Sequence, residues 1–194
     1  ESSKFTINHD FCMVFENVID PEVAKKIYDF IPDDCETMNF DVKDWPFPQV
    51  IPVMQDCANK YMENKPNLQK PELLSVHCFS LQKYCEENNR SFYYEIHDDI
   101  DDGVYLTSPV YLTPDAEEWR GGELIIHGNF TYQDYPHNTL QVNPKFGRAV
   151  FFPANKLHRV KPWMSDKPRK TLAFSWGLKE DWRTDLPSRD IPEI

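Results

Sequence analysis

The stretch TLQVNPKFGRAVFFPANKLHRVKPWMSDKPRKTLAFSW, residues 139–176, consists of short apolar or aromatic runs separated by turn-forming residues. Pro, Gly, Asn and Asp interrupt regular structure, and short runs bounded by them are typical of β-strands. The same pattern begins at Leu74 and gives eight predicted strands: 74–84, 91–97, 104–112, 123–126, 139–142, 149–152, 158–160 and 170–176. These runs, which show no internal repeat, predict a mainly β protein, a jelly roll whose mouth can hold a small ligand.

The residues before Leu74 instead show the period of helices. Asp20 is a suitable N-cap, Pro21 suits a first turn, and apolar residues continue at helical spacing to Phe30. A second helical repeat covers about residues 50–61. Because 194 residues suit one core, we expect a single domain over the whole chain. Its expected parts are helical support over about residues 1–72, a jelly-roll core over about 73–178 and a C-terminal tail over 179–194.

Composition limits the partners and the compartment. The chain has 32 acidic and 21 basic residues, a net charge of -11, so its average surface should repel nucleic acid. We expect no membrane association, since no run approaches the ~20 apolar residues of a spanning helix. The five cysteines form no CxxC pair and the first residues contain no apolar signal core, so we expect reduced thiols and a cytoplasmic protein. The oligomeric state is left open.

A candidate metal site lies where the predicted strand 91–97 ends. Alternate residues of a strand share a face, so His97 and Asp99 can bind one ion while Asp98 points away. His158 begins another predicted strand and can supply a third ligand. Two histidines and one carboxylate on one face of an octahedral ion leave three positions open, which is typical of non-haem iron(II) oxygenases. An HxD tripeptide alone is weak support, because a single histidine is more often a core or surface residue.

The order of motifs in the second half of the chain adds context to this triad. From Leu81 to Trp176 the motifs are His97-x-Asp99, Gly121-Gly122-x-Leu124, Pro144-Lys145-x-Gly147-Arg148, His158 and a basic residue before Trp176. This series resembles the prolyl 4-hydroxylase-like branch of the iron(II)/2-oxoglutarate-dependent dioxygenase superfamily. The resemblance implies a double-stranded β-helix, in agreement with the predicted jelly roll, and iron(II) bound by the triad. It also implies 2-oxoglutarate and O2 as cosubstrates and allows ascorbate as an addition.

The resemblance further implies a basic residue that binds the distal carboxylate of 2-oxoglutarate. Arg169 and Lys170 are neighbours, so only one of them can face the interior. We favour Lys170, because it shares a strand face with apolar residues and because the family's basic residue lies six positions before a Trp, as Lys170 does before Trp176. Arg169 is the alternative, since its planar fork also suits a carboxylate. Tyr111 and Tyr84 match two tyrosine positions of the family's cosubstrate site.

The activity implied by the resemblance is hydroxylation of an unactivated C–H bond in a prolyl-type substrate, either peptidyl or free. Two alternatives stay open. The first is a 2-oxoglutarate oxygenase that acts on another small molecule, and the second is a cupin-like metal-binding or sensing module without turnover. Such a module needs no clamp for a cosubstrate carboxylate, so Lys170 and Tyr111 distinguish the two classes.

Overall fold

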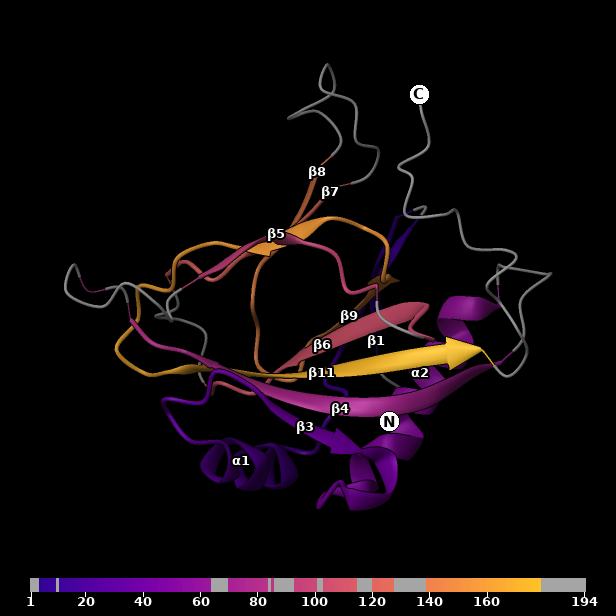
Figure 1. The fold of residues 1–194 in the computed structure, drawn as a ribbon, viewed down its shortest axis with the longest axis horizontal. Coiled ribbons are helices and arrows are strands. Elements are labelled where there is room, and N and C mark those ends of the chain that lie inside the picture. Colours follow the sequence, from indigo (N-terminus) through magenta and orange to yellow (C-terminus); the bar gives the residue numbers. More distant parts are fainter. Residues whose placement is uncertain are drawn as a thin grey trace.

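The chain folds around two antiparallel β-sheets (Figure 1). The larger sheet has seven strands in the order β1-β2-β9-β6-β11-β4-β3, and the smaller has four in the order β5-β10-β7-β8. The computed structural model describes residues 4–9, 11–63, 70–83, 85, 93–100, 103–114, 120–127 and 139–178. All statements on the structure concern these residues.

The strands alternate between the two sheets along much of the chain. Those of the larger sheet are β1 (Lys4–His9), β2 (Cys12–Glu16), β3 (Met38–Asp41), β4 (Pro71–Leu81), β6 (Leu106–Tyr111), β9 (Ala149–Pro153) and β11 (Arg169–Leu178). Those of the smaller sheet are β5 (Tyr94–His97), β7 (Leu124–His127), β8 (Thr139–Val142) and β10 (His158–Val160). From β4 to β11 the chain therefore crosses repeatedly between the sheets, as in a double-stranded β-helix.

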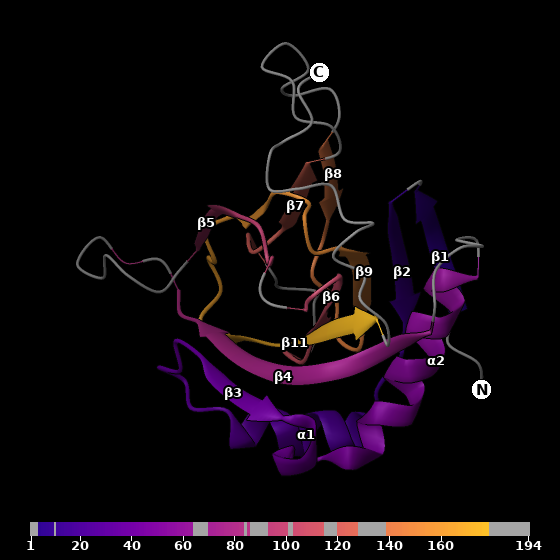
Figure 2. The same cartoon turned by 45° about the vertical axis from the view of Figure 1, so that its right-hand side comes forward.

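Helices cover the face of the larger sheet that is turned away from the smaller one (Figure 2). They are α1 (Pro21–Phe30), the short 3-10 turns η1 (Val42–Asp44) and η2 (Pro48–Val50), and α2 (Ile51–Met62). The Asp20 carboxylate accepts hydrogen bonds from the backbone N–H groups of Glu22 and Val23, so the predicted N-cap is confirmed. Crossing a bilayer would need a longer apolar helix than any in the described ranges.

Side chains pack in two separate cores, one on each face of the larger sheet. The core beneath the helices contains Ile27 of α1, Met54 of α2, and Leu172, Phe174 and Trp176 of β11. The core between the sheets contains alternate residues of β7 and β9. Because successive strand residues point to opposite faces, the remaining residues of β11 are directed toward the smaller sheet. β11, near the middle of the larger sheet, is thus buried on both faces.

The eight predicted strands and both predicted helices are confirmed, with shifts of a few residues at their ends. Helical support is an incomplete description of residues 1–72, since this part also contributes β1, β2 and β3 to the larger sheet. All five residues of β2 are buried and therefore show no apolar alternation, while β3 has only four residues. The predicted tail, residues 179–194, lies outside the described residues, and the division of the domain stays a prediction.

Candidate active site

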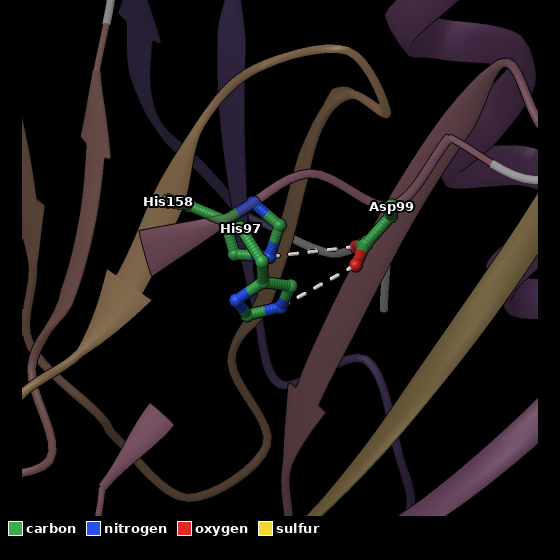
Figure 3. A group of neighbouring side chains, drawn as sticks. All are labelled: His97, Asp99 and His158. Atoms are coloured by element: carbon green, nitrogen blue, oxygen red, sulfur yellow. Dashed lines mark ion pairs between the residues drawn. The ribbon is translucent and has the colours of Figure 1, made fainter. Parts of the chain in front are cut away.

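The three predicted metal ligands meet where β5 ends and β10 begins (Figure 3). His97 pairs directly with His158 across these strands, and Asp99 follows two residues after β5. Nε2 of His97 lies 3.6 Å from Asp99 Oδ1, and Nε2 of His158 lies 3.5 Å from Asp99 Oδ2. One ligand atom of each residue lies within 4.8 Å of the other two. Two imidazoles and a carboxylate at this spacing fit an iron(II) ion.

Backbone carbonyls fix which nitrogen of each imidazole faces the ion. Nδ1 of His97 lies 2.6 Å from the Glu95 carbonyl oxygen, and Nδ1 of His158 lies 2.9 Å from that of Lys156. A carbonyl only accepts, so each Nδ1 donates and each Nε2 keeps its lone pair toward Asp99. Burial lowers the pKa of His158, against the opposing effect of the Asp99 carboxylate, and this favours the neutral, metal-binding imidazole.

Asp98 is not part of this cluster, as predicted from the strand alternation. Its carboxylate instead accepts a hydrogen bond from the backbone N–H of Ile100 at 3.2 Å. The backbone N–H of Asp99 donates to the Ala154 carbonyl at 2.9 Å, which attaches the ligand to the segment that precedes β10. Of these two acidic neighbours, Asp99 therefore belongs to the candidate metal site and Asp98 does not.

A cavity of about 560 Å³, its open mouth included, extends from the three ligands into the space between the sheets. Its walls are formed by Phe79, Tyr94, His97, Asp99, Thr107, Pro109, Tyr111, Leu124, Phe152, His158, Val160, Arg169, Thr171 and Ala173. The walls combine apolar side chains with the metal-ligand cluster and the cationic Arg169, and such a lining suits a small ligand that carries negative charge.

Arg169 and Tyr111 form a polar pair in the wall of this cavity. The Arg169 guanidinium carbon lies 5.0 Å from the centre of the Tyr111 ring, and Nη1 donates to Thr171 Oγ1 at 3.0 Å. Both residues are almost fully buried, and burial lowers the pKa of Arg169 and raises that of Tyr111. Neither the Tyr111 hydroxyl nor Arg169 Nε makes a well-aligned hydrogen bond with a described residue. A buried cation of this kind fits an anionic ligand.

The prediction that Lys170 faces this cavity is wrong. Its side chain lies on the opposite face of β11, under the helices, where Nζ is 2.7 Å from Asp33 Oδ1 and donates to the Tyr28 and Ile31 carbonyls. The apolar pattern of this face of β11 predicts that it lines the jelly-roll interior, but the face packs against α1 and α2. The structure thus places the alternative, Arg169, among the cavity residues.

A further tyrosine in the wall of this cavity, Tyr94, was not predicted from the sequence. His97 pairs with His158 while Tyr94 pairs with Val160, so β5 has one more residue than β10 between the two pairs. This bulge turns both Tyr94 and His97 toward the cavity although they are three positions apart. Strict alternation predicts the opposite orientation for Tyr94. The predicted Tyr84 lies outside the described residues.

The Pro144-Lys145-x-Gly147-Arg148 motif holds the backbone of Tyr111 through hydrogen bonds. Gly147 has a left-handed backbone, with φ +73°, and its N–H donates to the Tyr111 carbonyl at 2.9 Å. The N–H of Tyr111 in turn donates to the Arg148 carbonyl at 3.0 Å. The Arg148 guanidinium binds the buried Glu16 carboxylate of β2 through Nε and Nη2. The motif therefore fixes the strand end from which Tyr111 enters the cavity.

Comparison with known proteins identifies the family. The sequence matches the family described as the 2OG-Fe(II) oxygenase superfamily over residues 79–176, just over half of the chain. A search of curated proteins gave no significant match. The fold is similar to that of the collagen prolyl hydroxylase vCPH of Paramecium Bursaria Chlorella virus-1, solved as a 2OG complex. That structure has a TM-score of 0.61 and 18% identity, with 88% of this chain and 97% of that chain covered.

Two further solved structures have the same fold. The prolyl hydroxylase of Trichoplax adhaerens, in complex with a peptide of hypoxia inducible factor, has a TM-score of 0.58 and 14% identity, with 93% of this chain and 89% of that chain covered. The alpha ketoglutarate dependent epimerase SnoN from nogalamycin biosynthesis has a TM-score of 0.62 and 15% identity, with 91% and 85% covered.

Fold and site together define a double-stranded β-helix with a two-histidine, one-carboxylate metal site. The chain belongs to the 2OG-Fe(II) oxygenase superfamily. It is a 2-oxoglutarate-dependent dioxygenase, whose family implies iron(II), 2-oxoglutarate and O2. His97, Asp99 and His158 could bind the iron.

Proposed function

We propose that the chain binds iron(II) through His97, Asp99 and His158, and 2-oxoglutarate through Arg169 and Tyr111. The enzyme would hydroxylate an unactivated C–H bond in a prolyl-type substrate. The observation that carries this proposal is the buried Arg169 guanidinium, which has no carboxylate within ion-pair distance among the described residues and shares a cavity with the triad. A metal-sensing module would have no use for such a cation.

Three residues of the cavity wall have particular roles in this proposal. The Arg169 guanidinium pairs with the distal carboxylate of 2-oxoglutarate, and the Tyr111 hydroxyl donates a hydrogen bond to it. When bound, iron(II) would use O2 as the oxidant: one oxygen atom would enter succinate as 2-oxoglutarate loses carbon dioxide, and the other would enter the C–H bond as a hydroxyl group. Phe152, which contacts His158 edge-on at 4.9 Å between ring centres, helps to exclude water from the ligand cluster.

The accessibility of the metal site favours a peptidyl substrate over a fully enclosed one. The side chains of His97 and Asp99 are 43% and 31% exposed, so a chain on the surface can present one residue to the ion. Two of the similar structures are prolyl hydroxylases, one of them with a bound peptide, and this supports a prolyl-type substrate. The similar fold of SnoN supports the second candidate, a small-molecule substrate.

We expect the iron-loaded protein to convert 2-oxoglutarate to succinate slowly without a substrate and faster with its substrate. Succinate is measured by NMR with iron(II), ascorbate and O2, against metal-free protein and the Asp99→Ala variant. A panel of proline-containing peptides, free proline and other small molecules, followed by mass spectrometry for one added oxygen atom, identifies the substrate class. If the protein binds iron but forms no succinate with any member of the panel, the metal-sensing module is the better description.

The Gly121-Gly122 turn provides a second prediction, because Gly122 leaves room for the Arg169 side chain. A Cβ at Gly122, which has φ +70°, would lie 2.9 Å from Arg169 Cδ and 2.7 Å from Trp163 Cε3. We expect Gly122→Ala to lower the melting temperature and also to weaken 2-oxoglutarate binding, since the guanidinium must shift. Gly103→Ala is the control: φ is +91°, but the nearest atom to its Cβ is Leu74 Cδ1 at 3.7 Å.

Calorimetric titration of both iron-loaded variants under anaerobic conditions separates the two effects. Gly103→Ala should lose stability through backbone strain alone, at a cost of about 1–2 kcal/mol, and keep the affinity for 2-oxoglutarate. Equal affinities in the two variants would show that Gly122 does not control the position of Arg169.

A further inference from the structure

The Lys170 ammonium is buried on the helix side of β11, and each of its three hydrogens has an acceptor. Nζ lies 3.0 Å from the Tyr28 carbonyl oxygen, 2.6 Å from that of Ile31 and 2.7 Å from Asp33 Oδ1. The last carbonyls of a helix have no partner within it, and α1 has no basic residue in its last turn. Lys170 supplies the cation that this helix end favours, and so joins β11 to α1.

The backbone on both sides of Arg169 is held by side chains as well. The residue pairing between β6 and β11 begins at Thr171, and the Leu112 N–H donates to the Lys170 carbonyl at 3.0 Å. On this side of the strand the Thr113 hydroxyl accepts from the Lys170 N–H and donates to the Pro168 carbonyl, both at 3.0 Å. The Tyr28 hydroxyl donates to the same carbonyl at 3.3 Å. Thr113 thus binds the backbone on both sides of Arg169, at the Lys170 N–H and at the Pro168 carbonyl.

We propose that Lys170 and Thr113 are positioning residues for Arg169. This inference rests on the proposed function, in which Arg169 binds the distal carboxylate of 2-oxoglutarate. Neighbouring strand residues point to opposite faces, so anchoring Lys170 under the helices sets the depth at which Arg169 enters the cavity. The β4 ladder holds the other edge of the strand, where Arg169 pairs with Leu81. Two adjacent buried cations therefore serve one site from opposite faces of β11, one as an anchor and one as the ligand-binding group.

The test measures the dissociation constant of 2-oxoglutarate by calorimetry on iron-loaded protein under anaerobic conditions. Lys170→Met and the isosteric Thr113→Val should each weaken binding by about tenfold, because a displacement of ~1 Å can cost up to about a hundredfold. Thr113→Ser keeps the hydroxyl and should bind nearly as the wild type does. The affinity for iron(II) should stay unchanged, since neither residue contacts the triad.

Two controls distinguish positioning from a general loss of stability. Met54→Ala destabilises the same core from α2 and should leave 2-oxoglutarate binding unchanged. The analogue 2-oxopentanoate lacks the distal carboxylate, so Lys170→Met and Thr113→Val should not weaken its binding.

The inference is overturned if neither variant weakens the binding of 2-oxoglutarate. It is overturned as well if both variants weaken the binding of 2-oxopentanoate as much as that of 2-oxoglutarate. A third contradicting result would be a Met54→Ala variant that has a melting temperature similar to those of Lys170→Met and Thr113→Val and weakens the binding of 2-oxoglutarate as much as they do. If Lys170→Met does not fold, the comparison of Thr113→Val with Thr113→Ser decides. An Arg169→Ala variant that binds 2-oxoglutarate as the wild type does would contradict the proposed function itself.

Discussion

Asp99→Ala will abolish succinate formation and weaken iron(II) binding by more than about a hundredfold, whereas Asp98→Ala will leave both near the wild-type level. The outer partners of metal ligands already contribute about 10 to 100-fold in affinity, so loss of a direct ligand should cost more. Among the described residues, only Asp99 has its carboxylate within ion-pair distance of both imidazoles, at 3.6 Å and 3.5 Å from their Nε2 atoms. The adjacent Asp98 has the same side chain and a similar position in the chain, which makes it a matched control.

The two histidine variants should differ from each other in stability although both lose iron. The His97 side chain is 43% exposed, so His97→Ala should melt near the wild-type temperature in the absence of metal. The His158 side chain is only 7% exposed and packs against Phe152, so His158→Ala should also lower the melting temperature. Metal binding is followed by calorimetry and unfolding by circular dichroism. Loss of iron in Asp98→Ala but not in Asp99→Ala would contradict the ligand assignment.

The metal triad could be predicted from the sequence because its geometry is mostly local. His97 and Asp99 lie two positions apart, and their shared orientation needs only the period of an extended chain. His158 required the order of motifs, since pairing of β5 with β10 is a long-range contact. The strands of the jelly roll could also be predicted from local features, because turn-forming residues mark their ends.

The residue that we propose as the cosubstrate clamp, Arg169, could not be chosen from the pattern of β11, because both faces of this strand are buried. The apolar pattern predicts that the face with Leu172, Phe174 and Trp176 lines the interior of the jelly roll, but this face packs under the helices. Lys170 has the family's spacing of six positions before a Trp, but its side chain lies on the face of β11 that is turned away from the cavity. A cavity that binds a charged ligand is lined by the more polar face of the strand, here the one with Arg169 and Thr171.

The orientation of Tyr94 could not be predicted from the sequence for a different reason. Its orientation depends on the extra residue in β5 between the two pairs with β10, and such a bulge is set by long-range pairing. Burial raises the pKa of Tyr94 to about 12, so its hydroxyl stays protonated and can donate a hydrogen bond within the cavity at neutral pH. Nothing in the alternation of the local sequence reveals this.

Arg169→Ala will weaken 2-oxoglutarate binding by roughly a hundredfold or more. Breaking a buried ion pair by removal of one partner typically costs about 3 to 5 kcal/mol, and about 1.4 kcal/mol corresponds to a factor of ten. In this chain the guanidinium is buried beside Tyr111, and among the described residues it has no carboxylate of its own within ion-pair distance, so the distal carboxylate would lose its main partner. The dissociation constant is measured by anaerobic calorimetry on the iron-loaded protein. The Michaelis constant for 2-oxoglutarate is measured separately, in the succinate assay with O2.

The exposed Arg159 of β10 provides a matched control, because Arg159→Ala removes the same charge from the chain without removing a cavity residue. Its effect on 2-oxoglutarate binding should stay below about 1 kcal/mol, the usual limit for an exposed charge. Arg169→Ala should also bind 2-oxoglutarate and 2-oxopentanoate with similar affinity, whereas the wild type should prefer the dicarboxylate. If Lys170→Met instead causes the larger loss and Arg169→Ala keeps that preference, the distal carboxylate is bound by a group other than the Arg169 guanidinium.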